Sequence, residues 1–400
     1  MKSFAKKISN ALACIMVAGC ISANAAIGET PQASKIVIPV PSLPGIAHDD
    51  LREAFLAFGR SCAKYKGLGP DKRIAPGYTG VLLEPDYPAL MAACAEASAL
   101  LESNANTQSM LDVLDKHFEA VEVKPDTGAG LLTAYYEPTF AISKVRIDGF
   151  LDWPLYRKPA NLPTGSWMTR QAIESGQAED ALKGNVIGYA ERWAAYVLQV
   201  QGSGVGVLPD GTSIKLIYGG KNGHGYSSIG KVLVERGDIA ADKISMQEIK
   251  KWLNSRNREE QNSLYWRNPS YVFFDIDSRS DDDSRVGPPG AMNLDIGGLT
   301  PNRSIAVDWS FFVPGMPMFI NGTLGNGKKI SQLVIAQDRG GAIVSKIRVD
   351  LFLGAGNEAA EIAGKTRDEG LRLWELQFRT PKSTSNLNLA NQVQQSSKSR

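Results

Sequence analysis

The chain has 400 residues, a formal net charge of +2, and an ordinary globular composition in which 43% of residues are hydrophobic and 22% are charged. This length is enough for one large domain or two of moderate size. The small net charge excludes the strong basic excess that is typical of nucleic-acid-binding proteins. The chain has only three histidines, and two of its four cysteines lie in the first 25 residues, so zinc ligands are scarce. We expect no metal and no cofactor.

Residues 1–25 have the pattern of an export leader. Lysines near the start precede an apolar run, residues 11–18, which is too short to span a bilayer. Two cleavage sites compete within this leader. Ala23–Ala25 fits a signal-peptidase site, whereas Val17–Cys20 fits a lipobox in which Cys20 would carry the lipid. Both predict export, and the second adds a lipid anchor; the alternative is a buried N-terminal helix.

The region after the leader is predicted to be helical. Apolar residues with helical spacing favour helices over residues 49–64, 87–101 and 110–118. Asp50 stands at the N-cap position of the first of these helices. We interpret this region as scaffold and assign no chemistry to it.

Two cysteines, Cys62 and Cys94, lie beyond the leader. An even number of cysteines in an exported protein favours a disulfide, because the compartment outside the cytosol is oxidising. The alternative is a pair of buried free thiols that pack as small apolar side chains. The sequence therefore predicts a Cys62–Cys94 bridge.

Strand patterns begin near residue 131. Residues 131–137 form a predicted strand, which Pro138 ends. Further along we expect hairpins over 147–156 and 207–218, strands over 193–201 and 271–274, and helices within 166–183, 232–236 and 246–253. Acidic residues 281–283 are interpreted as part of a solvated loop, because no EF-hand spacing follows them. Residues 380–400 are polar and predicted to be disordered.

Three aspartates stand in predicted strands of the last third of the chain. Asp308 ends a strand that begins at Ser304, Asp338 follows the apolar run 333–336, and Asp350 lies between Val349 and Leu351. An aspartate inside an apolar strand is disfavoured by propensity and by burial. Burial also raises the pKa of a carboxyl group, which makes a general acid at neutral pH. One such aspartate alone is most simply a strand-end residue, but three in one small β unit indicate a site.

These aspartates stand in settings that resemble the three-aspartate domain of the membrane-bound lytic murein transglycosylases of type A. The three settings are SIAVD, AQDRGGAI and RVDLFLGAGNEA. Other blocks agree in order, namely Gly130–Pro138, Leu198–Gly204, Gly220–His224, Ser227–Gly230, Ser245–Met246 and Asn268–Phe274. The resemblance covers about residues 45–378.

The resemblance implies a mainly β, α+β fold in two domains. A double-psi β-barrel domain, preceded by helices, would combine residues 40–137 with residues 269–379. A smaller β domain, residues 138–268, would be inserted into it, and the substrate groove would lie between the two. The leader, residues 1–25, and the tail, residues 380–400, stand outside both domains.

The implied activity is that of a peptidoglycan lytic exotransglycosylase, a lyase-type enzyme that breaks the β-1,4 bond between N-acetylmuramic acid and N-acetylglucosamine. Its products carry 1,6-anhydromuramic acid ends, and no water is consumed. The implied partner is the peptidoglycan glycan strand, with wall-remodelling proteins as candidate partners and no nucleic acid. The implied location is the periplasm, where the lipobox reading would add an anchor in the outer membrane.

Within this resemblance Asp350 is the single acid and base. Its position in an apolar strand favours a raised pKa. Asp338 would lie close by and tune Asp350, Thr133 would orient the substrate, and Asp308 is either structural or a substrate contact. Further candidates for substrate binding are the aromatic, amide and polar residues of the matching blocks: Tyr135, Tyr136, Gln199, Gln201, Ser203, Lys221, Asn222 and Tyr226.

Two other classes of protein compete with this reading. The first is a non-catalytic, expansin-like glycan-binding wall protein, which shares a double-psi barrel and a carboxylate. The second is a β-barrel hydrolase that uses two carboxylates and water. The products separate the three, because only the lytic enzyme releases anhydromuropeptides, and only the hydrolase incorporates oxygen from water.

Overall fold

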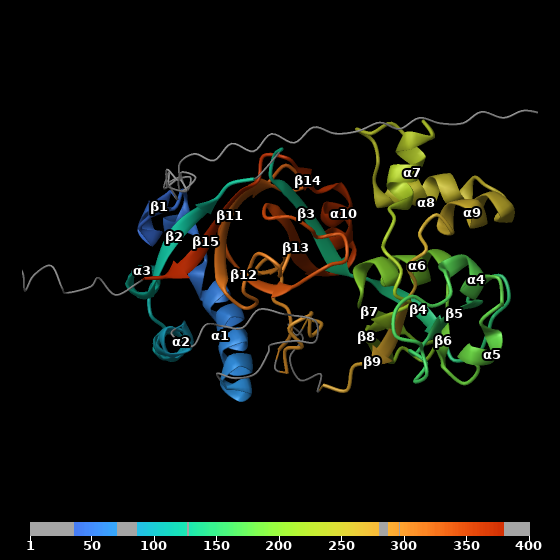
Figure 1. Ribbon diagram of the computed structural model, residues 1–400, viewed down its shortest axis with the longest axis horizontal. Helices are drawn as coiled ribbons and strands as arrows, with labels where there is room; N and C mark the ends of the chain where they lie inside the picture. Colours follow the sequence, from blue (N-terminus) through green and yellow to red (C-terminus); the bar gives the residue numbers. More distant parts are fainter. Residues whose placement is uncertain (1–35, 70–85, 126–127, 280–286, 296, 380–400) are drawn as a thin grey trace, which may run out of the picture. The chain divides into compact units, whose positions relative to one another are not determined.

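The computed structural model describes residues 36–69, 86–125, 128–279, 287–295 and 297–379 (Figure 1). These residues form two sheets, of nine and six strands, together with helices, so the fold class is α+β. The leader, the acidic residues 281–283 and the tail lie outside the described residues. Within the part of the chain that the structure describes, no helix is both long enough and apolar enough to cross a membrane.

The nine-stranded sheet collects strands from both ends of the described chain. Its order is β1-β2-β15-β11-β12-β10-β13-β3-β14. The bounds are β1 Val37–Ile38, β2 Phe118–Val123, β3 Leu131–Glu137, β10 Ser304–Ala306, β11 Pro317–Thr323, β12 Lys329–Asp338, β13 Arg348–Ala355, β14 Arg367–Asp368 and β15 Arg372–Phe378. Among the described residues the edge strands β1 and β14 are not paired with each other, so the main-chain ladder does not close into a barrel.

The short strand β10 fixes the register at the centre of this sheet. It runs parallel to β12 and antiparallel to β13, and Ala306 is paired with Asp338 on one side and with Asp350 on the other. On its far side β13 pairs in parallel with β3, which places Thr133 opposite Asp350. Neighbouring strands lie about 4.8 Å apart, so the main chains at the two aspartates are separated by roughly 10 Å.

The predicted N-terminal helices are confirmed as α1 Leu51–Leu68, α2 Asp86–Glu102 and α3 Thr107–His117. They pack on the core of the nine-stranded sheet through apolar side chains such as Phe55 and Leu90. A further helix, α10 Asn357–Lys365, follows β13 and packs against β3 (Figure 1). No sequence pattern had predicted α10, β14 or β15.

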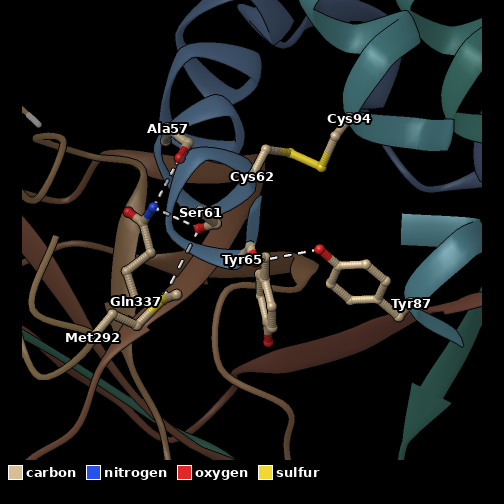
Figure 2. Close-up of a disulfide and its surroundings, with 8 residues drawn as sticks. All are labelled: Ala57, Ser61, Cys62, Tyr65, Tyr87, Cys94, Met292 and Gln337. Carbon is tan, nitrogen blue, oxygen red and sulfur yellow. Dashed lines mark hydrogen bonds between the residues drawn. A yellow bond between two sulfur atoms is a disulfide. The ribbon is translucent and has the colours of Figure 1, made fainter. Parts of the chain in front are cut away.

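A buried glutamine ties α1 to the strand that carries Asp338. Gln337 of β12 donates through Nε2 to the carbonyl oxygen of Ala57 (2.7 Å) and to the Ser61 hydroxyl (2.8 Å). Figure 2 shows these contacts on one side of α1 and the Cys62–Cys94 bridge to α2 on the other. Buried polar groups with satisfied hydrogen bonds hold their neighbours in one arrangement. The helical layer is thereby joined directly to the residue before Asp338.

The predicted disulfide is present, and its Cα atoms are 5.6 Å apart. The bridge closes a loop with a sequence separation of 32 residues, for which chain entropy predicts about 3–4 kcal/mol of stabilisation. Replacing both Cys62 and Cys94 by alanine should lower the free energy of unfolding in urea by about this amount. Reductant should destabilise the wild-type protein to the same level and leave the double variant unchanged. Equal stability of both oxidised proteins would contradict the prediction.

The six-stranded sheet has the order β5-β6-β4-β7-β8-β9. Its strands are β4 Thr139–Ser143, β5 Trp153–Tyr156, β6 Val186–Ala190, β7 Gly204–Val207, β8 Ser213–Lys221 and β9 Val272–Ile276. The predicted hairpin over 207–218 is confirmed as β7–β8. The predicted hairpin over 147–156 is wrong in part, because β5 pairs with β6 and only an isolated bridge joins Ile147 to Leu151.

Helices accompany this sheet. They are α4 Arg170–Glu174, α5 Glu179–Leu182, α6 Arg192–Gln201, α7 Ile229–Glu235, α8 Met246–Asn254 and α9 Arg258–Tyr265. Asp50, the predicted N-cap of α1, stands at that position but makes no side-chain cap hydrogen bond. Helices α4 and α8 of the six-stranded region do have side-chain caps: the Thr169 hydroxyl accepts from the amide of Ala172, and the Ser245 hydroxyl accepts from the amide of Glu248. These caps satisfy amide groups that a helix leaves unpaired at its start.

The predicted strand over 193–201 is wrong, because this segment is the helix α6. Tyr196, Val197 and Val200 are good strand formers, which misled the local prediction. In the structure α6 packs between two apolar clusters, with Leu198 in one and Tyr196 in the other. The helix ends at Gly202, whose φ of 86° is readily adopted only by glycine.

Candidate active site

Asp350 lies at the centre of a chain of three side chains from β13 and β3. The Thr133 hydroxyl donates to Oδ1 of Asp350 at 2.5 Å. Arg348 donates through Nη1 to Oγ1 of Thr133 at 2.8 Å. Because the Thr133 oxygen accepts from Arg348, its hydroxyl proton is directed to Asp350. Among the described residues, Oδ2 of Asp350 has no hydrogen-bond partner, so this oxygen is free to exchange a proton with a ligand.

Asp338 is held by three donors on its two oxygens. Tyr135 donates its hydroxyl to Oδ2 at 2.7 Å, and the amides of Ala291 and Arg339 donate to Oδ1 at 2.8 and 2.9 Å. The Trp309 indole donates to the main-chain carbonyl of Asp338 at 3.1 Å. Hydrogen bonds from several donors favour the ionised form of a carboxyl group. Asp338 is therefore the better-stabilised anion of the pair.

Burial raises the pKa of both carboxyl groups above the ordinary aspartate value. For Asp350 the hydroxyl of Thr133 and the charge of Arg348 oppose this rise, and the neighbouring Asp338 adds to it. For Asp338 the rise is opposed by Tyr135 and by two backbone amides. Two carboxyl groups whose surroundings differ in this way divide into an acid and an anion. The hydrogen bonds therefore favour the anion more strongly at Asp338 than at Asp350.

Tyr135 connects the two halves of the site. Thr133 and Tyr135 are two residues apart in β3, so their side chains lie on the same face of the strand. Each donates a hydrogen bond to one of the two aspartates. The Tyr135 ring packs against Phe352, its partner on β13, with ring centroids 5.3 Å apart. Burial and the charge of Asp338 raise the pKa of Tyr135 well above its ordinary value, so the phenol stays protonated and keeps donating.

Asp308 lies outside this pair and organises a turn. Its Oδ1 accepts from the amide and hydroxyl of Ser310, and its Oδ2 accepts from the amide of Ser345 at 2.9 Å. These donors outweigh partial burial and hold the pKa of Asp308 below its ordinary value. A carboxylate of lowered pKa is a poor general acid. Its contacts support the structural reading of this residue.

Two of the predicted substrate-binding residues are buried and bond neighbouring segments, although Nε2 of Gln199 has no hydrogen-bond partner among the described residues. Gln199 accepts through Oε1 from Arg170 at 2.8 Å and from the amide of Val272 at 3.3 Å. Asn222 donates through Nδ2 to two main-chain carbonyls and accepts through Oδ1 from the amide of Tyr271. These side chains join segments of the six-stranded region to one another. Asn222 has no polar atom left for a ligand.

The other predicted substrate-binding residues are more accessible. Gln201, the last residue of α6, accepts from the amide of Tyr136 at 3.0 Å and so links the helix to β3. Ser203 is partly buried, Lys221 is exposed, and the Tyr226 side chain is 38% exposed. No contact links these three to the aspartates, whereas Thr133 and Tyr135 bond them directly.

Sequence reasoning missed Arg348 and the backbone amides that hold Asp338. Arg348 could have been found, because residues two apart in a strand share a face and Arg348 stands two before Asp350. The amide of Ala291 could not, since it comes from a loop 47 residues away.

A second buried acid, Glu137, was also missed. It ends β3 on the face that carries Thr133 and Tyr135, and it is 5% exposed. Burial raises its pKa to about 7, although Lys215 and Arg279 nearby oppose the rise. The native protein therefore binds a proton at Glu137 more tightly than the unfolded chain does.

Replacing Glu137 by glutamine should make stability less dependent on pH. A raised native pKa means that the wild-type protein loses stability relative to the variant as pH rises from about 4.5 to about 7. The variant should gain on the order of 2–3 kcal/mol relative to wild type across this window. Urea unfolding at pH 4 and at pH 8 measures the difference, which should be small at the lower pH. A difference that is the same at both values would contradict the raised pKa.

Two known family models match parts of the chain. Residues 131–275 match the family model described as the MltA specific insert domain, and residues 303–377 match the 3D domain. A curated relative, the membrane-bound lytic murein transglycosylase A of Escherichia coli strain K12, is 32% identical over 252 residues. The match covers 61% of this chain and 64% of the relative, so the chain spans somewhat less than two thirds of that protein's length.

Solved structures are similar over most of the chain. A lytic transglycosylase, LtgG, of Burkholderia pseudomallei has 33% sequence identity and a TM-score of 0.55, with 86% of this chain and 96% of that chain covered. The Escherichia coli MltA structure with bound chitohexaose has 26% identity and a TM-score of 0.65, with 88% and 96% covered. These neighbours share the mixed α+β architecture described above.

Proposed function

The chain belongs to the membrane-bound lytic murein transglycosylase A family, and we propose that it cleaves peptidoglycan without water. The bond broken would be the β-1,4 linkage between N-acetylmuramic acid and N-acetylglucosamine, and the product would carry a 1,6-anhydromuramic acid end. The names of the relatives and the chitohexaose bound to one of them support a glycan substrate. Exolytic action along the strand remains part of this proposal.

The observation that carries the proposal is the pair of unlike carboxyl groups on either side of Ala306. Asp338 accepts three hydrogen bonds, whereas Asp350 accepts one and leaves Oδ2 without a partner among the described residues. One protonated carboxyl with an available oxygen is sufficient for a general acid that later acts as a base. A second carboxylate that activates water is not required.

In the proposed reaction Asp350 first donates its proton to the bridging oxygen. The bond between C1 of the muramic residue and that oxygen breaks, and the N-acetylglucosamine end leaves as an alcohol. Positive charge develops at C1, and the neighbouring Asp338 anion would stabilise it. The Asp350 carboxylate then takes the proton of the C6 hydroxyl, whose oxygen bonds to C1. The proton returns to Asp350, so atoms and charge balance.

The ring closure gains from being intramolecular. The attacking oxygen belongs to the same sugar as C1, and effective molarities of well-oriented intramolecular reactions are on the order of 10⁵ M or more. Thr133, which Arg348 holds from behind, would keep Asp350 in one rotamer during both proton transfers. We propose that Thr133 orients Asp350 in this way, and that the hydroxyl of Tyr135 orients Asp338.

For the remaining contacts we propose that accessible residues bind the glycan and buried ones do not. The accessible residues proposed to contact the glycan are Lys221, Ser203, Tyr226 and Gln201. Tyr136 lies on the face of β3 opposite Thr133 and Tyr135. Gln199 and Asn222 would act indirectly, because their polar atoms hold the main chain of the segments around β9. Asp308 would stabilise the turn through the amides of Ser310 and Ser345, and it would not contact the sugar.

We further propose that the chain has two domains. Residues 40–137 with 269–379 would form the catalytic domain, and residues 138–268 the inserted one. Strand membership supports this division except at β9, Val272–Ile276, which belongs to the six-stranded sheet. A double-psi barrel is proposed for the first, supported by a hydrogen bond from the amide of Thr323 in β11 to the Asp368 carboxylate in β14. The glycan groove would lie between the domains.

The proposed location is the periplasm, at the cell envelope. The relatives' names describe membrane-bound proteins. Lipidation at Cys20 is the proposed means of attachment to the outer membrane, with cleavage after Ala25 as the alternative. Metabolic labelling with a lipid precursor distinguishes the two, since only a lipidated Cys20 retains the label.

Product analysis tests the activity. Purified peptidoglycan is incubated with the protein in water enriched in oxygen-18, and the released muropeptides are analysed by mass spectrometry. We expect 1,6-anhydro ends that contain no heavy oxygen, because no water enters the bond. Labelled reducing ends would establish a hydrolase instead, and binding to the wall without release would establish an expansin-like protein.

Removing the charge of Asp338 tests its proposed role. Asp338→Asn should lower turnover less than loss of Asp350 does. The Asp338 charge raises the pKa of Asp350, so the variant should have a lower Asp350 pKa. A general acid works below its pKa, and the alkaline limb of the pH profile of kcat/KM should therefore move to lower pH. A profile that keeps its alkaline limb in place would contradict this coupling.

A further inference from the structure

A pocket of about 280 Å³ lies beside β4 and the start of α6, apart from the aspartate pair. Its lining includes Tyr136, Phe140, Phe150, Glu191, Trp193 and Lys250. The volume is close to the lower end of the roughly 300–1,000 Å³ that is usual for small-molecule sites. Tyr136 points to the face of β3 opposite Thr133 and Tyr135, because side chains alternate along a strand. The pocket is therefore distinct from the proposed catalytic centre.

Two hydrogen-bonding groups of this pocket lack a partner within the described residues. The Tyr136 hydroxyl and the Trp193 indole nitrogen have no hydrogen-bond partner there. Burial raises the pKa of Tyr136, so its phenol remains a donor. Phe150, which lines the pocket, is 62% exposed. A ligand that covered this ring would bury apolar surface, which favours binding. These features together indicate a binding site and not a packing defect.

The charges of the pocket select the class of ligand. Oε2 of Glu191 and Nζ of Lys250 are 3.7 Å apart, and the two side chains are 51% and 42% exposed. An exposed pair at this distance is weakly held, with a contribution of about 0–1 kcal/mol, so a ligand can separate it. A ligand that carries both a carboxylate and an ammonium would neutralise both charges, whereas a neutral sugar could form hydrogen bonds with them but could not neutralise them.

The position of the pocket fits a substituent of the muramic residue. Tyr136 is three residues from Thr133 along β3, which is about 10 Å at the rise of a strand. An extended tripeptide also spans about 10–11 Å. Measured along β3, a short peptide attached to a sugar at the aspartates therefore covers the spacing to Tyr136, and the proposal requires the peptide to pass the end of the strand to enter the pocket.

We propose that this pocket binds the stem peptide of peptidoglycan, a short zwitterionic chain with free carboxylates and an ammonium. The proposal rests on the proposed function, since it takes the peptide from the same glycan substrate. Lys250 would bind a peptide carboxylate, Glu191 the ammonium, and Phe150 and Trp193 the aliphatic stems. The site would make the enzyme prefer strands that still carry their peptides.

The experiment compares two substrates that differ only in the peptide. Glycan strands with stem peptides, and the same strands after amidase treatment, are each assayed with the wild-type protein and with Phe150→Ala and Lys250→Ala. The ratio of kcat/KM for peptide-bearing to peptide-free strands should fall about five- to tenfold in each variant. Ile147→Ala, on the same loop and outside the pocket lining, is the matched control and should keep the wild-type ratio.

Calorimetry with a soluble stem tripeptide supplies a readout that does not depend on catalysis. The wild-type protein should bind alanyl-γ-glutamyl-diaminopimelate, and Lys250→Ala should weaken that binding. Absence of binding together with an unchanged ratio would overturn the proposal. An equal loss on both substrates would also overturn it, because the pocket would then contact sugar. Peptide binding by a protein that releases no anhydro product would count against the proposed function alone.

Discussion

Replacing Asp350 by asparagine is expected to remove turnover while leaving glycan binding intact. The amide keeps the shape of the carboxyl group and can still accept from Thr133, but it cannot donate a proton to the leaving oxygen. Loss of one general acid–base group typically costs about 10²–10⁴-fold in rate, and here one group serves as acid and then as base. We expect a loss at the upper end of this range or beyond.

The measurement is the rate of anhydromuropeptide release, with binding to insoluble peptidoglycan measured in parallel. Asp308→Asn is the matched control, because it removes a carboxylate from the same sheet region that bonds only a turn. Its effect should appear mainly as lower stability. Near-wild-type anhydro product from Asp350→Asn, with loss in Asp338→Asn instead, would transfer the acid–base role to Asp338.

Replacing Glu174 by glutamine is expected to destabilise the six-stranded region strongly. Glu174 bonds Arg170 and Arg192, each at 3.0 Å, and all three side chains are at most 7% exposed. The variant leaves two buried guanidinium groups without a counter-charge. Removing one partner of a buried ionic cluster costs about 3–5 kcal/mol, because the remaining charge stays buried. The free energy of unfolding in urea should fall by this amount.

An exposed ion pair provides the control for Glu174. Lys231 and Glu235 lie 3.6 Å apart on α7, with side chains 76% and 61% exposed. Glu235→Gln should change the free energy of unfolding by about 0.5 kcal/mol or less. A loss below about 1 kcal/mol in Glu174→Gln would contradict the prediction, because it would show that water reaches the cluster.

The Glu174 variant also carries a functional expectation. Arg170 bonds Gln199, which in turn accepts from the amide of Val272 in β9. Loosening this cluster should raise KM more than it lowers kcat, because the proposed glycan contacts of this region would lose their fixed positions while the aspartates keep theirs. A fall in kcat at constant KM would argue against an indirect role for Gln199.

Much of the local structure was predictable from short-range patterns. Helical spacing gave α1, α2 and α3, and the segments 166–183, 232–236 and 246–253, which were expected to contain helices, correspond to α4 with α5, α7 and α8. Cys62 and Cys94 are the two cysteines beyond the leader, and they form the predicted disulfide. Each of these features depends on residues close in sequence, or on simple counting, so no knowledge of the fold was needed. The same reasoning failed for α6, where strand-forming residues such as Tyr196 and Val197 suggested a strand, and packing against two apolar clusters favoured a helix.

The sequence by itself determined that Asp338 and Asp350 stand in strands, and that the strand of Asp350 is apolar. Asp308 was expected to end a strand, but it lies two residues beyond the end of β10. Only the tertiary structure decided which of them work together. The register of β3, β13, β10 and β12 brings Thr133 to Asp350 across 217 residues, and Tyr135 to Asp338 across 203. It also sends Asp308 into a turn. Strand pairing over such distances is set by the burial of whole sheet faces, because a one-residue slip would turn every side chain to the opposite side.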